Sequence, residues 1–259
     1  MEHNDNLLLS SIFSCIDNTT LEGSDTTARV TQLCNDSLRM VNPQNGINHV
    51  AAVCVYPVFV SLCRKLLNDS PIRVAAVAGA FPSGQSPLPV KLQEVRYAVQ
   101  EAADEIDMVI SRGALIEGRS QQVFDEIAAI RQEAASCTLK VILETGELTP
   151  ELIRQASTIA IQAGADFIKT STGKIPVGAT LEAAKIMLQV INDHHLATNK
   201  LVGFKAAGGV STPEQALDYY RLAQSILGID HIDNHIFRIG ASRLTNRLYQ
   251  HLNIITNNN

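Results

Sequence analysis

The stretch Ala165-Asp-Phe-Ile-Lys-Thr-Ser-Thr-Gly-Lys174 begins as a buried strand and ends as a loop. Ala165, Phe167 and Ile168 are apolar, whereas the small hydroxyl residues and the glycine that follow them are typical of a loop. Lys169 falls where the strand should still be inside the protein. Because burial of an ammonium group is costly, such a lysine is paired with a carboxylate, held neutral, or used in chemistry.

The pattern of a buried strand followed by a helix recurs along the chain on both sides of this stretch. Continuous apolar runs such as His49–Val55 are typical of strands that are covered on both faces. About eight such runs alternate with helical patterns, which predicts a TIM barrel and a single (β/α)8 domain over residues 1–259. The predicted strands are Ser14–Asp17, His49–Val55, Ile72–Ala78, Glu105–Ile110, Thr138–Leu143, Phe167–Thr170, Leu201–Lys205 and Phe237–Ile239.

A doubly wound open sheet is the rival fold. It usually brings a Gly-x-Gly-x-x-Gly turn after an early strand, and the sequence has none. Two helix starts are marked clearly, because Thr149-Pro150-Glu151 and Thr212-Pro213-Glu214 each combine an N-cap, a proline and an acidic first turn. Gly164 and Gly228 are the expected stops of these two helices.

Composition excludes several classes of protein. The chain has 259 residues with 46% hydrophobic and 18% charged content, which suits one domain with a sizeable core. Its net charge is −5 and it has no long basic run, so a nucleic-acid partner is not expected. The five cysteines are scattered without a Cys-x-x-Cys pair, which argues against a zinc site or a disulfide framework and favours a reducing cytoplasm.

The two ends of the chain add little to the fold. Residues 1–13 are expected to form a short helix or arm, and Leu7–Leu9 is too short for the apolar region of a secretion signal. The polar tail Asn257–Asn259 is expected to fray. Since no apolar run approaches the length that spans a membrane, we expect a cytoplasmic protein without a membrane partner.

Three charged side chains fall near the carboxyl ends of predicted strands, where the active residues of barrels gather. Successive side chains of a strand alternate between the barrel interior and the helix layer. If the large aliphatic neighbours pack on the helices, Lys169, Lys205 and Asp107 all point inward. We therefore expect two lysines and one carboxylate to meet inside the barrel.

Two interior lysines and a carboxylate are the groups that a class I aldolase needs. A lysine is nucleophilic only when neutral, and an ordinary pKa of about 10.4 leaves few neutral amines at pH 7. Burial and a second ammonium group both lower the pKa and prepare the amine to form a Schiff base with a carbonyl carbon. The alternative is a structural ion pair between a lysine and an aspartate, with Glu144 and Asp17 balancing the charge.

Glycine-containing loops follow the late predicted strands. They are Gly173-Lys174, Gly208-Gly209-Val210 and Gly240-Ala241-Ser242. Small residues let backbone N–H groups reach an anion, and the helix that starts at Thr212-Pro213 adds the positive end of a dipole. These loops predict a phosphate site, although glycines in such loops are often only turn residues.

Four motifs resemble the deoxyribose-phosphate aldolase family, in the same order and over nearly the whole chain. They are Glu105-Ile-Asp-Met-Val109, Phe167-Ile-Lys-Thr-Ser-Thr-Gly-Lys174, Gly203-Phe-Lys-Ala-Ala-Gly-Gly-Val210 and Phe237-Arg-Ile-Gly-Ala-Ser242. The resemblance implies a TIM barrel that uses no metal and no organic cofactor. It implies reversible cleavage of 2-deoxy-D-ribose 5-phosphate to acetaldehyde and D-glyceraldehyde 3-phosphate, in deoxyribonucleoside catabolism.

The resemblance also implies roles for individual residues. Lys169 matches the Schiff-base lysine, Lys205 matches the lysine that lowers its pKa, and Asp107 matches the aspartate that relays protons. Cys54, on its own, reads as a core cysteine. Asp17, Cys54 and Thr172 match positions that line the sugar site, and Gly173, Lys174, Gly208, Gly209, Gly240 and Ser242 match the phosphate end.

The sequence departs from the family pattern near the phosphate end. Many members have proline at the position of Ala206 and arginine at the position of Ser211, whereas Arg243 stands where serine or threonine is common. Arg243 is therefore a candidate for the missing positive charge, and the alternative is that the phosphate binds more loosely. Some members end in a tyrosine that reaches the site, but the last tyrosine here, Tyr249, is followed by a polar tail, so that role is not transferred.

Three alternatives stay open from the sequence. The first is a Schiff-base aldolase with another phosphorylated sugar, and the second is a barrel that binds a sugar phosphate without turnover. The third is a metal-dependent aldolase, although His194-His195, at a polar helix end, lacks the placement of metal ligands. The sequence also leaves the oligomeric state open, with a homodimer as one option.

Overall fold

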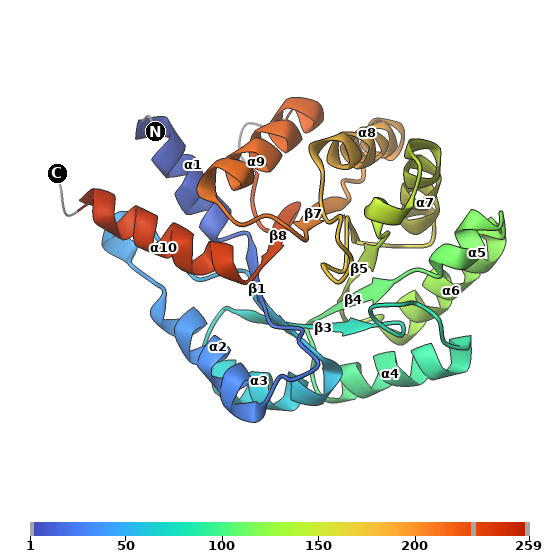
Figure 1. Cartoon of the computed structure of the whole chain (residues 1–259), viewed down its shortest axis with the longest axis horizontal. Coiled ribbons are helices and arrows are strands. Elements are labelled where there is room, and N and C mark those ends of the chain that lie inside the picture. Colours follow the sequence, from blue (N-terminus) through green and yellow to red (C-terminus); the bar gives the residue numbers. More distant parts are fainter. Residues whose placement is uncertain (1–2, 229–231, 257–259) are drawn as a thin grey trace.

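The computed structural model describes residues 3–228 and 232–256, which form a closed barrel of eight parallel strands surrounded by helices (Figure 1). Each strand pairs with the next in the chain, and the barrel closes where Ile16 of the first strand pairs with Ile239 of the last. The TIM barrel predicted from the sequence is therefore confirmed. The strands are β1 (Ile16–Thr19), β2 (Ala52–Val55), β3 (Arg73–Ala78), β4 (Glu105–Val109), β5 (Thr138–Ile142), β6 (Phe167–Lys169), β7 (Gly203–Ala207) and β8 (Phe237–Ala241).

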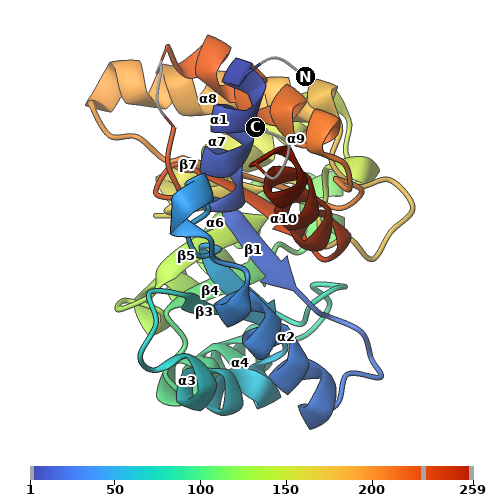
Figure 2. The same ribbon diagram turned by 90° about the vertical axis from the view of Figure 1, so that its left-hand side faces the viewer.

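The helices lie outside the strands, and α1 packs against α9 and α10 beside the point where the barrel closes (Figure 2). In this contact the rings of Phe13 and Tyr249 lie 6.2 Å apart, so Tyr249 is part of the packing between α1 and α10. The α-helices are α1 (His3–Phe13), α2 (Thr27–Arg39), α3 (Val60–Leu67), α4 (Leu88–Gln100), α5 (Arg112–Ile116), α6 (Ser120–Glu133), α7 (Pro150–Gln162), α8 (Leu181–Thr198), α9 (Pro213–Leu227) and α10 (Arg243–Thr256). Three short 3₁₀ helices are η1 (Pro43–Asn45), η2 (Pro57–Phe59) and η3 (Thr145–Glu147).

Helix signals in the sequence are confirmed at both marked starts. The Thr149 hydroxyl accepts a hydrogen bond from the amide of Leu152, and Thr212 forms a reciprocal capping box with Gln215. Gly228 ends α9 in the left-handed region with φ +65°. The expected tail at Asn257–Asn259 lies outside the described residues.

The first strand begins two residues later than the sequence predicts. The amide of Cys15 donates a hydrogen bond to the carbonyl of Ile12, so the turn that closes α1 uses the residues expected to open the strand. The carbonyl of Cys15 accepts a hydrogen bond from the amide of Ile239, and regular strand pairing starts only at Ile16. Local bonding at the helix end therefore outweighs the apolar pattern here.

The two faces of the strands bury different chemistry. Apolar side chains such as Val53, Val141 and Phe204 pack between the strands and the helices. The barrel interior instead holds one small apolar cluster around Cys54 and Val77, together with many buried charged groups. This polar interior is the setting of the candidate site.

Gly203 shows how tightly the interior is filled at the amino end of the strands. A Cβ atom at this position would lie 2.2 Å from the ring of Phe167 on the neighbouring strand. The Phe167 ring in turn lies 5.6 Å below the guanidinium of Arg238.

All five cysteines are free thiols, and no helix in the described part of the chain is long and apolar enough to cross a membrane.

Candidate active site

The three side chains that strand alternation directs inward meet in the barrel. The Nζ atoms of Lys169 and Lys205 each donate a hydrogen bond to Oδ2 of Asp107, at 2.7 Å in both cases. Lys169 and Lys205 are paired neighbours on β6 and β7, while Asp107 reaches them from β4. Asp107 and Lys205 are fully buried, and Lys169 is 3% exposed.

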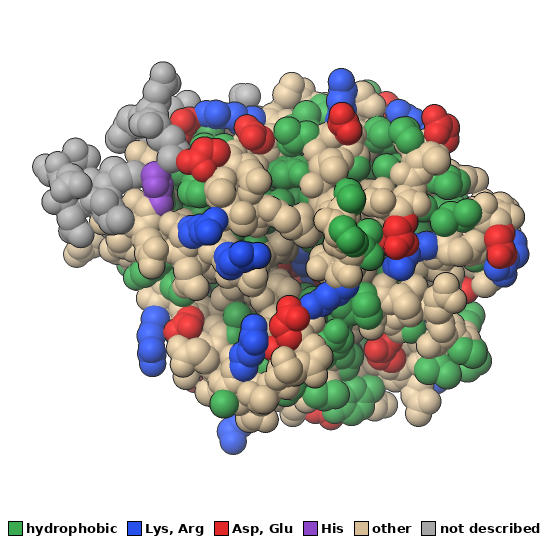
Figure 3. All heavy atoms as spheres, viewed as in Figure 1, with side chains coloured by type: hydrophobic (Ala, Val, Ile, Leu, Met, Phe, Trp, Pro, Cys, Tyr) green, Lys and Arg blue, Asp and Glu red, His purple; other side chains and the backbone are tan. Residues whose placement is uncertain are grey.

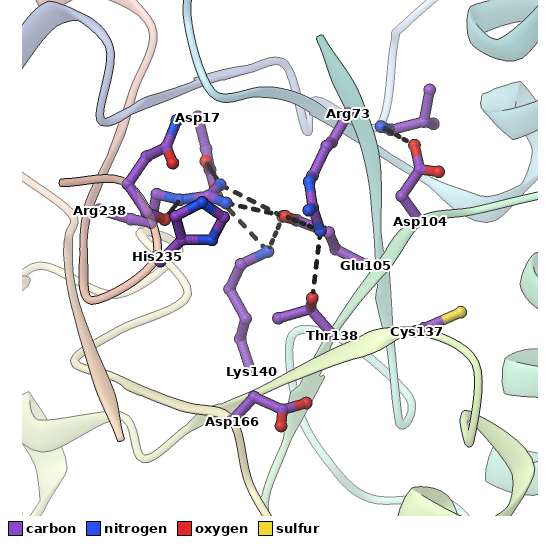
Figure 4. A network of polar contacts seen from close by, with 12 residues as sticks. Asp17, Arg73, Asp104, Glu105, Cys137, Thr138, Lys140, Asp166, His235 and Arg238 are labelled. Carbon is purple, nitrogen blue, oxygen red and sulfur yellow. Dashed lines mark hydrogen bonds and ion pairs between the residues drawn. The ribbon is translucent and has the colours of Figure 1, made fainter. Parts of the chain in front are cut away.

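Asp107 also belongs to a closed ring of alternating acidic and basic side chains, which we call the charge ring. Its links include Lys140 to Asp107 at 2.8 Å, and Arg238 to Asp17 at 2.6 Å and to Glu105 at 2.9 Å. Lys140 also donates to Glu105, and Lys205 donates to Asp17. Figure 4 shows four of its members, with Lys140 and Arg238 both reaching Glu105. The order around the ring is Asp107, Lys205, Asp17, Arg238, Glu105, Lys140 and back to Asp107.

The charge ring is electrically balanced, and Lys169 is not part of the balance. Three carboxylates and three basic side chains alternate in the ring, so its formal charges cancel. Lys169 joins it as a seventh group, and its acceptor Asp107 is already shared with two other ammonium groups. The nearby buried carboxylate of Glu144 has its own basic neighbour, Arg112, at 3.5 Å.

Lys169 consequently has a lowered pKa. Burial, which disfavours the charged form, is the largest cause; Asp107 opposes the change and the ammonium group of Lys205 adds to it. The pKa of Lys205 is raised instead, because the attraction of Asp107 and Asp17 outweighs its burial. The pKa of Lys140 is raised in the same way, because the attraction of Asp107 and Glu105 outweighs its burial. Of these three interior lysines, Lys169 is thus the one disposed to lose its proton.

The carboxylate between these lysines stays ionised. Burial alone would raise the pKa of Asp107, but the ammonium groups of Lys140, Lys169 and Lys205 outweigh burial and hold the pKa well below its ordinary value. Asp107 can therefore accept hydrogen bonds from several donors at once. Its Oδ2 atom accepts one hydrogen bond from Lys169 and one from Lys205.

Lys169 lines a cavity of about 320 Å³ at the carboxyl ends of the strands. Every residue assigned from the sequence to the phosphate end lines the same cavity, as do Thr172 and the loop after β1. The phosphate-end residues are Gly173, Lys174, Gly208, Gly209, Gly240, Ser242 and Arg243. Gly208 and Gly209 have φ of +85° and +87°. The two backbones approach so closely at Gly178 that a Cβ atom on Gly178 would lie 2.3 Å from the carbonyl oxygen of Gly208.

Basic side chains lie at the rim of this cavity, and lysines and arginines surround a hollow near the centre of the face seen in Figure 3. Lys174 is paired with Glu22 at 3.0 Å, which joins the loop after β6 to the loop after β1. Arg29 is paired with Asp25 at 3.1 Å. No ion pair involves Arg243 among the residues that the structure describes, so Arg243 offers an uncompensated positive charge.

Glu144 has a positioning role that the sequence did not reveal. It is a non-glycine residue with φ +60°, in the left-handed region, and it is fully buried. Its carboxylate accepts hydrogen bonds from the amide of Thr172 at 3.0 Å and from its hydroxyl at 2.5 Å. The Thr172 hydroxyl accepts a bond from the amide of Lys174. Glu144 therefore holds the loop between Lys169 and Lys174 in shape.

Asp17 and Cys54, which the resemblance placed at the sugar site, lie outside the cavity lining. Asp17 is fully buried within the charge ring, and Cys54 lies deep in the interior, where burial raises its pKa to about 11. Sequence reasoning missed Lys140, Glu105 and Arg238, although alternation along their strands gives each the interior parity. It also missed Arg29 at the cavity rim.

A parallel eight-stranded barrel with a polar site at the carboxyl ends of its strands defines the class of TIM-barrel enzymes. A model of the DeoC/LacD aldolase family matches residues 12–242. The chain therefore belongs to the DeoC/LacD family of aldolases, which are carbon–carbon lyases. Within residues 3–228 and 232–256, no three His, Cys, Asp or Glu side chains are grouped so that they could hold a metal ion.

Solved structures agree with this assignment. A protein of Coccidioides immitis, provisionally named a deoxyribose-phosphate aldolase, is 31% identical with a TM-score of 0.79, over 94% of this chain and 86% of that chain. An aldolase called QR15 is 29% identical with a TM-score of 0.78, over 95% and 97%. The deoxyribose phosphate aldolase of Aeropyrum pernix, a tetramer, shares the fold at 21% identity and a TM-score of 0.74, over 98% and 100%.

Proposed function

We propose that this aldolase is a class I enzyme that forms a Schiff base at Lys169 and cleaves 2-deoxy-D-ribose 5-phosphate reversibly to acetaldehyde and D-glyceraldehyde 3-phosphate. One observation carries the proposal: Lys169 is the unbalanced seventh charge of a buried interior and faces the cavity that holds the basic loops. The similarity to proteins named deoxyribose-phosphate aldolases supports the choice of substrate.

The reaction begins when the neutral Nζ of Lys169 adds to the aldehyde carbon C1 of the open-chain sugar. Loss of water then gives a protonated imine, which can accept an electron pair. The proton of the C3 hydroxyl leaves, the C2–C3 bond breaks, and its electron pair moves into an enamine. D-Glyceraldehyde 3-phosphate is released at this point.

Asp107 and Lys205 handle the protons of these steps in the proposed mechanism. Asp107 is ionised and bonded to both lysines but does not line the cavity, so in the proposed mechanism it takes up the C3 hydroxyl proton through a water molecule. A proton returned to C2 converts the enamine to the imine of acetaldehyde. Hydrolysis of this imine releases acetaldehyde and frees Lys169, and it consumes one water molecule, which balances the one released when the first imine formed.

The phosphate group is proposed to bind at the glycine-containing loops that line the cavity together with Lys169. Backbone amides of Gly208 and Gly209 lie there in the left-handed conformation, which exposes N–H groups to an anion. Lys174 and Arg243 supply positive charge, since the family arginine is replaced by Ser211. The cavity of about 320 Å³ suits a small phosphorylated sugar.

Borohydride reduction in the presence of acetaldehyde tests the Schiff base. We expect an irreversible two-carbon adduct, seen by intact mass and mapped to the peptide that carries Lys169. A sample without acetaldehyde is the control for nonspecific reduction. An adduct on Lys205 would reassign the nucleophile, and a folded protein that traps no aldehyde would overturn the class I proposal.

The substrate is tested separately by cleavage assays. Cleavage, followed as release of D-glyceraldehyde 3-phosphate or, for the unphosphorylated sugar, of glyceraldehyde, should be fastest from 2-deoxy-D-ribose 5-phosphate, compared with ribose 5-phosphate, free deoxyribose and fructose 1,6-bisphosphate. Preference for another phosphorylated sugar, together with an adduct on Lys169, would retain the mechanism and replace the substrate.

A further inference from the structure

Two members of the charge ring, Glu105 and Arg238, lie at the amino ends of the strands, away from the cavity that Lys169 lines. Glu105 opens β4 and is two residues, roughly 7 Å, before Asp107 along the strand. Arg238 lines a different surface cavity, of about 690 Å³, together with Arg73, Lys200 and His235. Neither residue lines the cavity proposed to bind substrate.

Their contacts run in a continuous path to the site. Arg238 contacts Glu105 through both terminal nitrogens, at 2.9 and 3.3 Å, and Glu105 accepts a bond from Lys140. Lys140 donates to Asp107 at 2.8 Å, and the other oxygen of Asp107 accepts from Lys169. Each of these links joins groups that are at most 4% exposed, so solvent screens them weakly.

We propose that Glu105 and Arg238 are positioning residues for the aldolase reaction, and that the charges they carry at the distant end of the barrel set the protonation state of Lys169. The inference rests on the proposed function of Lys169. With the charge ring balanced, Lys169 is the surplus cation of the interior. Removal of the Glu105 charge leaves the ring with a net positive charge, which disfavours the protonated form of Lys169. Removal of the Arg238 charge leaves the ring with a net negative charge, which favours the protonated form of Lys169.

Coulomb's law gives the size of the effect. A unit charge roughly 7–10 Å away, at an effective dielectric constant of about 20, shifts a titration by about one to two pH units. The ionisable groups nearest Lys169 are Asp107 from β4, Lys205 from β7 and Cys54 from β2. Those facing the distant pair are Asp17, Lys140 and the half-exposed Arg73, which lies 3.7 Å from Glu105.

A purely structural role for the pair predicts a different outcome. Loss of either partner would then loosen the barrel and lower the rate at every pH without moving the titration of Lys169. A charge role predicts shifts of opposite sign for the two partners. The sign of the shift therefore separates the two explanations.

The experiment measures the rate of acetaldehyde trapping at Lys169 by cyanoborohydride as a function of pH, with the adduct mapped to its peptide. We expect Glu105→Gln, which keeps shape and removes charge, to move the midpoint about one unit lower. Arg238→Gln should move it about one unit higher, and the double variant should return close to the wild-type midpoint. Arg238→Lys keeps the charge and should keep the midpoint even if its rate falls.

The exposed pair Arg96–Glu133, between α4 and α6, provides matched controls. Arg96→Gln and Glu133→Gln make the same charge changes on the outer surface and should leave the midpoint unchanged. Circular dichroism establishes which variants are folded, and Glu105→Gln with Arg238→Lys suffices for the test if Arg238→Gln does not fold.

Two failures can be told apart. If the wild-type protein gives no adduct on Lys169, the proposed function fails. If the adduct forms but the midpoint of Glu105→Gln stays in place or rises, the inference fails and the Schiff-base assignment stands. A midpoint shift in Arg238→Lys as large as that in Arg238→Gln would also contradict it.

Discussion

Two buried lysines in this molecule show what separates a structural lysine from a reactive one. Lys91, on α4, is fully buried among the helices and donates hydrogen bonds to Glu126 at 2.9 Å and to Ser111 at 2.7 Å. Lys169 is equally enclosed but shares Asp107 with two other ammonium groups. Burial alone therefore does not prepare an amine for chemistry. The two lysines differ in that Lys91 has a carboxylate of its own, whereas Lys169 shares its carboxylate with two other ammonium groups.

The largest expected effect is the loss of the amine itself. Lys169→Met should lower turnover by at least about 1,000-fold, because no other group on the proposed path can form the imine. The free energy of unfolding should hold or rise, since the variant removes the surplus charge of the interior. Steady-state kinetics and urea unfolding check the two parts, and substantial residual turnover would sink the assignment of Lys169.

Lys91→Met should show the reverse behaviour. The change leaves Glu126 as a buried carboxylate without its cation, which costs about 3 kcal/mol of unfolding free energy. Urea unfolding measures the loss, and turnover of the folded variant should equal that of the wild type. Lys91→Met combined with Glu126→Gln is the matched control and should recover most of the stability. A fall in turnover comparable to that of Lys169→Met would erase the contrast.

Lys205→Leu sharpens the comparison by changing the neighbour of Lys169. Removing this ammonium group takes away a repulsion that lowers the pKa of Lys169, so that pKa should rise. The amine is reactive only when it is neutral, at a pH above its pKa, so the acid limb of kcat/KM should move about one unit to higher pH. Turnover at pH 7 should fall about tenfold. An unchanged pH profile would show that Lys205 does not tune Lys169.

Arg243→Ala tests the rim of the cavity and should change the binding of substrate rather than its turnover. Loss of one charged phosphate contact should raise KM for 2-deoxy-D-ribose 5-phosphate about tenfold and leave KM for free deoxyribose unchanged. Arg96→Ala removes the same charge from the outer helices and serves as control. Equal changes for both sugars would exclude Arg243 from the phosphate site.

Much of the fold was readable from the sequence, because buried parallel strands and helix caps leave local patterns. The apolar run at His49–Val55, of which only Ala52–Val55 forms strand β2, and the capped starts at Thr149 and Thr212 depend on neighbours in the chain. The late start of β1 was not readable, since it depends on the bond that the Cys15 amide makes with Ile12.

The meeting of Lys169, Lys205 and Asp107 was predictable from strand alternation, whereas the charge ring was not predicted. Lys140 lies between Leu139 and Val141, and Arg238 between Phe237 and Ile239, so the same alternation assigns both to the interior. Their pairing depends on the closure of β8 onto β1, which brings Arg238 beside Asp17. The left-handed backbone of Glu144 left no signal, because glycine or asparagine would be expected at such a position.

The enclosure of the charge ring has a consequence for the ionic medium. Dissolved ions screen charges at the surface over about 8 Å at physiological ionic strength, but they screen the buried charges of the charge ring much less. The basic rim around Arg243 and Lys174 is open to those ions. Added salt should thus weaken the capture of a phosphorylated substrate while leaving the reactivity of Lys169 alone, so affinity and chemistry respond separately to the same change of solution.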